Sequence, residues 1–247
     1  MSRRCLALLF FFLPLLCISG QGMAMTGDSV LLSDPRLALS DRVWAYDSEK
    51  ARQIVGTLFR RTEALASYRC TILNFYHQKS LLPDEWLTLS VRYPKTIRMD
   101  LLRPRKGAAL VYRRSTGLVR VKPFGFLSFR LTLSPRNSLL VSRFGHTIDH
   151  SDFESFTRRI LKPACLARAC LYLGKGIWKG RPVDILNVAP DVLEAHRIFG
   201  RMLILVNKQT GFPVMIETIS PLGDFMERVE YRNCQTNVLY PQGYFKL

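Results

Sequence analysis

The sequence predicts an α+β fold in which one large, curved antiparallel sheet, an incomplete β-barrel, wraps a few helices. Three observations support this prediction. Between residues 85 and 122, apolar and polar side chains alternate in four short runs separated by turn residues, which is typical of strands with one buried face. Five further strand patterns follow residue 170. Only two segments have helical periodicity, so helices can cover only part of so large a sheet.

The strands follow one another in short runs. The first is expected over residues 68–78, which are rich in aromatic and β-branched side chains. The second, residues 87–92, has an apolar and a polar face, and Pro94 ends it because proline fixes φ and favours an extended residue before itself. The other runs share this alternation or its bounding turns: residues 97–101, 110–112, 119–122, 171–178, 182–188, 202–207, 212–220 and 225–234.

Two helices are expected to accompany the sheet. In the first, residues 49–66, apolar side chains recur at helical spacing and Ser48 can cap the N-terminus. Its apolar stripe is explained by packing against the sheet. The second begins at the capping box Ser151-Asp152-Phe153-Glu154 and ends at Lys162-Pro163.

The N-terminus has the layout of a cleavable signal peptide. Two arginines precede an apolar run, residues 5–18, that is well short of the ~20 residues a membrane span needs, and a small, polar segment ends at Ala24. The alternatives are an uncleaved anchor and a lipoprotein beginning at Cys17, although the bulky Leu16 stands where a small residue is needed. We therefore expect export to the periplasm and three parts: a signal peptide (1–24), a leader segment (25–46) and a single half-barrel domain (47–247).

The chain is strongly basic, with a formal net charge of +17. Between residues 92 and 136 it holds twelve Lys or Arg and one acid, Asp100. Such a field favours anionic partners, and export leaves an anionic membrane surface as a candidate and argues against nucleic acid. The basic surface is expected to include Arg92, Arg98, Arg113, Arg114, Arg120 and Lys122.

Four cysteines remain after the signal peptide, an even number in an oxidising compartment. Cys165 and Cys170 close a short loop and form the favoured disulfide. Cys70 and Cys234 either join the first and last strands or stay buried as free thiols. No Cys-x-x-Cys pair occurs, which disfavours zinc, and we expect no metal or other cofactor.

The best candidate for a catalytic or metal site is His146 and His150 with Asp149 or Asp152. The capping box places both histidines before the helix begins, so they lack the helical spacing that would converge their imidazoles. No third histidine is nearby, and the sequence has no nucleophile elbow and no phosphate-binding loop. The sequence therefore predicts a protein that is not an enzyme.

The apolar face of the sheet is the expected ligand-binding surface. Helices too few to fill a curved sheet leave apolar surface for an acyl chain, each CH₂ of which gains about 0.8 kcal/mol on burial. The alternative for each residue is ordinary core beneath the first helix. By parity, the lining residues are Leu87, Leu89, Val91, Ile97, Met99, Leu101, Leu110, Tyr112, Val119 and Val121.

Residues 122–130 interleave aromatic side chains with glycine and positive charge. Phe124, Phe126 and Phe129 are costly to expose. They either plug the core, form a flap over the ligand cavity, or form a tip that dips into a membrane surface.

Two motifs carry a family resemblance. The first is an x-Pro turn followed by aliphatic-Arg-aliphatic-Asp, residues 93–100, and the second is the Asn-Lys-Gln-Thr-Gly-Phe-Pro turn of residues 207–213. On these motifs, residues 48–235 resemble the periplasmic lipoprotein carriers LolA and LolB, and more closely an uncharacterised exported bacterial family, a domain of unknown function. The resemblance implies a half-barrel whose concave face holds acyl chains. The sequence departs from the carriers at Tyr93, where they have arginine, and at Asn207, where they have aspartate.

We therefore expect a periplasmic, non-enzymatic binding protein or carrier for a lipid or a lipidated protein, held on the apolar concave face. One alternative is an envelope-sensing regulatory module of the same fold, which passes a signal to a membrane partner. The other is a metal-dependent enzyme that uses His146 and His150.

Overall fold

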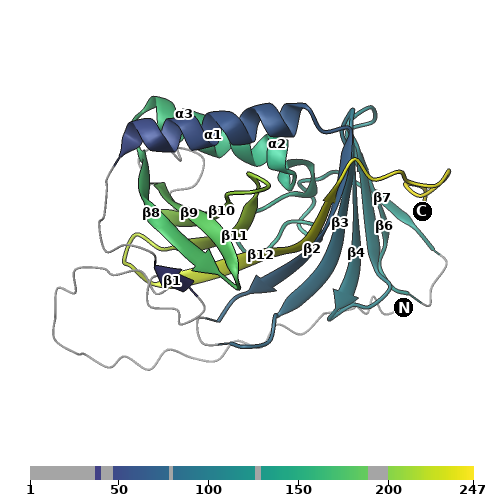
Figure 1. Ribbon diagram of the computed structural model, residues 1–247. Helices are drawn as coiled ribbons and strands as arrows, with labels where there is room; N and C mark the ends of the chain where they lie inside the picture. The colour runs from purple at the N-terminus through teal and green to yellow at the C-terminus, as the bar shows by residue number, and fades with distance from the viewer. Residues whose placement is uncertain (1–36, 40–46, 78–79, 126–128, 189–199) are drawn as a thin grey trace, which may run out of the picture.

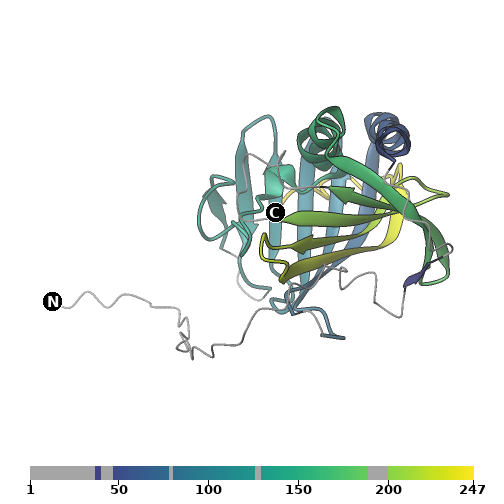
Figure 2. The ribbon, with the colours of Figure 1, turned by 90° about the vertical axis from the view of Figure 1, so that its left-hand side faces the viewer.

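A single antiparallel sheet dominates the computed structural model, which describes residues 37–39, 47–77, 80–125, 129–188 and 200–247. The twelve strands follow the order β1-β8-β9-β10-β11-β12-β2-β3-β4-β5-β6-β7, so the sheet is open, with β1 and β7 at its edges. Figure 1 shows it bending beneath the helices, and Figure 2 shows the same arrangement from the side. The predicted fold class is confirmed. The strands are β1 (Leu37–Leu39), β2 (Ser67–Phe75), β3 (Glu85–Arg92), β4 (Thr96–Arg103), β5 (Ala109–Arg113), β6 (Leu118–Lys122), β7 (Leu131–Leu133), β8 (Cys170–Trp178), β9 (Arg181–Val188), β10 (Arg201–Asn207), β11 (Pro213–Ile219) and β12 (Phe225–Thr236).

The first helix, α1 (Ser48–Glu63), lies where the periodicity predicts it. Its N-cap is Asp47 rather than Ser48, because the Asp47 carboxylate accepts a 2.8 Å hydrogen bond from the backbone N–H of Lys50. The apolar stripe faces the sheet, with Ala51, Val55 and Leu58 buried.

The second helical segment is longer than predicted. It consists of α2 (Phe153–Phe156), a π-helical part η2 (Thr157–Leu161) and α3 (Lys162–Leu166). The predicted end at Lys162-Pro163 was wrong because Pro163 falls in the first turn of α3, where a missing N–H costs no helical hydrogen bond. A short 3₁₀ turn, η1 (Ile148–His150), precedes α2.

The two faces of the sheet differ in what covers them. The inner face, by which we mean the face toward the helices, carries the main apolar core together with buried residues of α1, η2 and α3. A smaller core lies on the outer face of β8–β11. Successive residues of β10, such as Ile204 and Leu205, therefore enter different cores, and both are fully buried.

Two strands are not indicated by alternation in the sequence. β1 lies inside the predicted leader and pairs with β8, and β7 extends the meander beyond β6. Each has three residues, too few to reveal a period. The predicted signal peptide lies outside the described residues. In the part of the chain that the structure describes, no helix has the length and apolar character needed to cross a bilayer.

The cysteines pair differently from the favoured prediction. Cys70 on β2 and Cys234 on β12 form a disulfide across 164 residues, which decides between the two alternatives that the sequence left open for this pair. Cys165 and Cys170 are free and buried, and the disulfide predicted between them was wrong. Their closeness in sequence favoured that pair, whereas the pairing of β2 with β12 brings the distant pair together.

Candidate functional site

The inner face is the candidate functional site, and the structure brings the predicted lining residues together there. Seven of the ten belong to the main core and are at most 8% exposed, whereas Met99 and Leu110 are partly buried against it. Leu101 lies opposite Leu87 in the β3–β4 ladder and therefore on the same face. The fully buried members are Leu87, Leu89, Val91, Ile97, Tyr112, Val119 and Val121.

Other apolar side chains of the inner face are less well covered than those seven. Val229 lies on β12, in the middle of the sheet, and yet is only partly buried. Its exposure is therefore no edge effect, and the helices leave part of the inner face accessible. Sequence reasoning missed this position, although the alternation along β12 was a signal. The partly buried set comprises Ile54, Tyr93, Met99, Leu110, Leu133, Leu140, Phe144, Phe156, Ile160, Met226, Val229 and Tyr231.

A polar cluster joins the β3–β4 turn to the start of α2. Asp152 is buried and caps α2, because its Oδ1 accepts a 3.0 Å hydrogen bond from the N–H of Ser155. The Lys95 ammonium lies 2.9 Å from Asp152 Oδ2 and donates to Ser155 Oγ. The Tyr93 hydroxyl donates to Asp152 Oδ1 at 3.3 Å, and burial, with the nearby Asp152 charge, raises the pKa of Tyr93. The cluster thus fixes the second helical segment over the inner face.

Tyr93 and Arg92 point to opposite faces, as their parity predicts. Tyr93 bonds Asp152 on the inner side, whereas the Arg92 guanidinium lies over the Phe245 ring, 4.8 Å from its centroid. The second difference from the carriers, Asn207 in place of aspartate, preserves the hydrogen bonds of the turn. The Asn207 side-chain oxygen accepts hydrogen bonds from the N–H groups of Gln209 and Thr210, which an aspartate in a turn also does.

A second polar contact crosses from the loop before η1 to the centre of the sheet. His146 Nε2 donates to Glu227 Oε1 of β12 at 2.6 Å, and Glu227 is 4% exposed. Burial alone would lower the pKa of His146, but the hydrogen bond and the charge of Glu227 outweigh it and raise the pKa. The pair ties the loop to β12.

This pair should make stability depend on pH. A histidine whose pKa is higher in the folded than in the unfolded state stabilises the folded protein. Its contribution to the free energy of unfolding is complete below the unfolded pKa of ~6.5 and is lost as the pH rises through the folded pKa. We expect His146→Gln to lower the free energy of unfolding more at about pH 5.5 than at about pH 8.5 in urea titrations. The control is His150→Gln. Burial, Arg159 and Lys95 lower the pKa of His150, so removing this residue should relieve destabilisation in acid. An equal effect of His146→Gln at both pH values would contradict the prediction.

The two histidines have different acidic partners among the described residues. His146 is paired with Glu227, and His150 Nε2 lies 3.4 Å from Asp149 Oδ2, while Asp152 is engaged by Lys95. Among the described residues, no group of three or more His, Cys, Asp or Glu side chains is arranged to hold a metal ion. This geometry therefore does not support the alternative in which His146 and His150 bind a metal or act in catalysis.

The C-terminal tail, residues 237–247, covers part of the predicted basic surface. Besides the contact of Arg92 with Phe245, Arg98 donates to the Tyr244 carbonyl, and Arg113 donates to the Phe245 carbonyl at 3.0 Å. Sequence reasoning missed this packing, since no periodicity marks the tail. Of the other predicted basic residues, Arg114 and Arg120 are exposed and Lys122 is half-buried, and their role at a membrane stays a prediction.

The predicted flap is described only in part. Phe126 lies outside the described residues, whereas Phe124 and Phe129 are 44% and 46% exposed. The alternative in which these two aromatics plug the core was therefore wrong. Whether they act as a flap stays a prediction.

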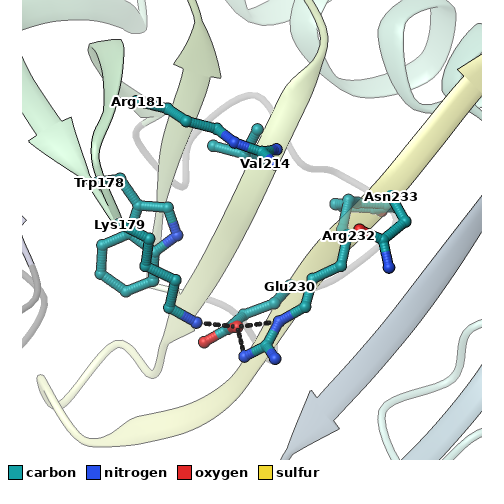
Figure 3. Close-up of a pocket in the computed structure, with 8 residues that line it drawn as sticks. Trp178, Lys179, Arg181, Val214, Glu230, Arg232 and Asn233 are labelled. Atoms are coloured by element: carbon teal, nitrogen blue, oxygen red, sulfur yellow. Dashed lines mark hydrogen bonds and ion pairs between the residues drawn. The ribbon is translucent and has the colours of Figure 1, made fainter.

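A small pocket lies on the other side of the molecule from the helices, between the tip of the β8–β9 hairpin and β12 (Figure 3). Its volume is about 120 Å³. Glu230 is 1% exposed and accepts hydrogen bonds from Lys179 at 2.6 Å and from Arg232 at 2.7 Å. Burial raises the pKa of Glu230, but these two bonds outweigh it and lower the pKa. The pocket is thus built around a compact charge cluster and does not suit an acyl chain.

An open, curved antiparallel sheet with an incompletely covered apolar inner face defines the class of protein: a half-barrel, as the sequence predicts. The sequence matches no protein-family model and no curated protein.

Several solved structures are similar to the chain. The Mycobacterium tuberculosis lipoprotein LppX is 12% identical over 79% of this chain and 99% of its own, with a TM-score of 0.49. An outer membrane lipoprotein-sorting protein domain from Vibrio parahaemolyticus is 11% identical, with coverages of 81% and 97% and a TM-score of 0.45. A LolA superfamily protein from Nitrosomonas europaea is 11% identical, with coverages of 78% and 97% and a TM-score of 0.37.

Proposed function

We propose that this protein is a periplasmic binding protein or carrier that holds the acyl chains of a lipid or a lipidated protein against the inner face of its sheet. The observation that carries the proposal is the partial exposure of Val229. Apolar side chains in the middle of a sheet are normally covered by the layer packed on it. Val229 faces the helices and is still partly exposed to solvent.

The surroundings of Val229 support the same ligand class. The partly buried set includes Phe156 and Ile160 from the second helical segment and Met99 from β4, so apolar surface is offered from both the helices and the sheet. Each acyl CH₂ that leaves water in such a place gains about 0.8 kcal/mol. The fully buried members of the predicted lining form the floor beneath this surface rather than contact the ligand themselves.

The proposal is tested first by identifying what the protein carries. Protein purified from its own host is examined by native mass spectrometry, and its organic extract is analysed for lipids. We expect acyl species in stoichiometric amount. A protein that carries no acyl species, and that does not bind a fluorescent fatty acid added afterwards, would not be a carrier of this kind.

A substitution locates the site. Val229→Trp adds bulk where the inner face is accessible, and it introduces no charge. We expect the affinity for the fluorescent fatty acid to fall roughly tenfold. This fall corresponds to displacing two CH₂ groups of the ligand from the apolar surface, at about 0.8 kcal/mol each. Fluorescence titration gives the dissociation constants.

The matched control is Leu118→Trp. Leu118 is 43% exposed and alternates on β6 with the buried inner-face residues Val119 and Val121, so it lies on the outer face. The control should bind as the unmodified protein does. If both variants bind equally well, the ligand does not lie at β12.

A further inference from the structure

Large apolar side chains are exposed at one end of the sheet, which the arrowhead of β4 marks at the bottom of Figure 1, away from the helices. We call this end the distal rim. Its side chains are between 42% and 85% exposed, although leucine, tryptophan and phenylalanine are costly to leave in water. They are Leu81, Leu82, Trp86, Leu102, Phe124 and Phe129.

The strand register places these residues side by side. Trp86 at the start of β3 pairs with Arg103 at the end of β4, and Ala109 at the start of β5 pairs with Lys122 at the end of β6. The turns that carry the exposed side chains therefore leave the sheet at the same end. Two of these turns touch, because a Cβ added to Gly107 would lie 2.7 Å from the Cα of Gly125.

A further turn extends the rim on its other side. The β11–β12 turn carries Leu222, which is 89% exposed. Gly223 and Asp224 of this turn line a pocket together with Tyr76 and His77, which follow β2. Apolar side chains thus protrude from successive turns rather than from one loop.

The rim also has an excess of positive charge directed at solvent. Arg103, Arg105, Lys106 and Arg130 are exposed, and none forms an ion pair with another described residue.

Two of the nearby acids are bonded to β2 and the residues after it. Asp84 accepts a hydrogen bond from the Tyr76 N–H at 2.7 Å, and Glu85 accepts from Asn74 and from the Tyr76 hydroxyl. A third acid, Asp224, is exposed and accepts a hydrogen bond from the Ser220 hydroxyl in the β11–β12 turn. The four exposed cations outnumber this exposed acid, so the rim presents a net positive charge to an approaching surface.

We propose that the distal rim docks the protein on the surface of an anionic lipid bilayer. Protruding leucines and aromatic rings match the boundary between head groups and acyl chains, and the cations match anionic head groups. The C-terminal tail covers part of the basic surface expected from the sequence, so we place docking at the distal rim, where exposed cations and apolar side chains lie together. Docking goes beyond the proposed carrier function and does not depend on what the inner face holds.

The experiment uses flotation of the purified protein with vesicles of equal parts phosphatidylglycerol and phosphatidylcholine, against vesicles of phosphatidylcholine alone. Binding is expected to the anionic vesicles and to weaken with added salt, because salt screens surface charges. Trp86 is a built-in reporter of the rim, and its emission, isolated as the difference from Trp86→Phe, should shift to the blue on binding.

Two double variants test the contributions of the cations and of the apolar side chains to binding. Arg105→Glu with Lys106→Glu should weaken partition by roughly 30-fold, and Leu81→Ser with Leu82→Ser should weaken it by at least roughly tenfold. Matched controls lie at the opposite end of the sheet: Arg114→Glu in the β5–β6 turn, and Leu239→Ser, which replaces a 97% exposed leucine on the tail. These positions are exposed, so all four variants should fold, which their thermal unfolding verifies.

Several outcomes overturn the inference. The inference fails if no vesicles are bound under any condition tested, or if the controls lose as much binding as the rim variants. If sedimentation shows a dimer that the rim substitutions dissociate, and no vesicles are bound, the rim forms contacts between copies of this chain instead. Loss of fatty-acid binding with intact docking would reject the proposed carrier function and leave this inference standing.

Discussion

Replacing Asp152 with alanine is expected to lower the free energy of unfolding by about 3–5 kcal/mol. The Asp152 side chain is fully buried and holds Lys95, the Tyr93 hydroxyl and the N-terminus of α2 at once. Its removal leaves the Lys95 ammonium, whose side chain is 13% exposed, without its carboxylate. Urea unfolding followed by far-UV circular dichroism measures the loss.

Two further variants separate the contributions to this loss. Asp152→Asn keeps a side-chain oxygen for the cap of α2 but removes the charge, so it isolates the ion pair from the cap. Asp152→Ala combined with Lys95→Met removes both charges and should recover much of the stability, because no buried ion is then left alone. A loss near 1 kcal/mol for Asp152→Ala would mean that Asp152 acts as a helix cap alone.

Removing the disulfide by Cys70→Ala with Cys234→Ala is expected to lower the free energy of unfolding by about 2–4 kcal/mol. The bond joins β2 to β12 across 164 residues, so most of the domain lies inside the loop that it closes. Opening this loop frees the unfolded chain to expand. We therefore expect a larger dependence of the unfolding free energy on denaturant as well as a lower midpoint.

The matched control is Cys165→Ala with Cys170→Ala, which removes two buried thiols that are not cross-linked. This variant loses some packing, but its denaturant dependence should equal that of the unmodified protein. If the two double variants show the same denaturant dependence, the bond between Cys70 and Cys234 does not constrain the unfolded chain in solution.

The sequence by itself determined the faces of the strands. Alternation along residues 87–92 and 97–101 predicted which side chains point inward, and Leu89, Val91 and Ile97 are all fully buried on the inner face. A period of two is a local property of the chain, so it survives without knowledge of the partner strand. The same holds for the turn at Asn207 and for the start of α2, although the N-cap is Asp152 rather than Ser151, with which the predicted capping box begins.

Only the tertiary structure decided which distant residues meet. The pairing of β2 with β12 selected Cys70 and Cys234 over the closer cysteines, and β12 also brought Glu227 to His146. The exposure of Val229, the tail over Arg98 and the turns gathered at the distal rim likewise depend on what the sheet packs against. Local periodicity fixes the direction of a side chain, whereas its cover is set by segments far away in the chain. The floor of the inner face was therefore predictable from the sequence, but its accessible part was not.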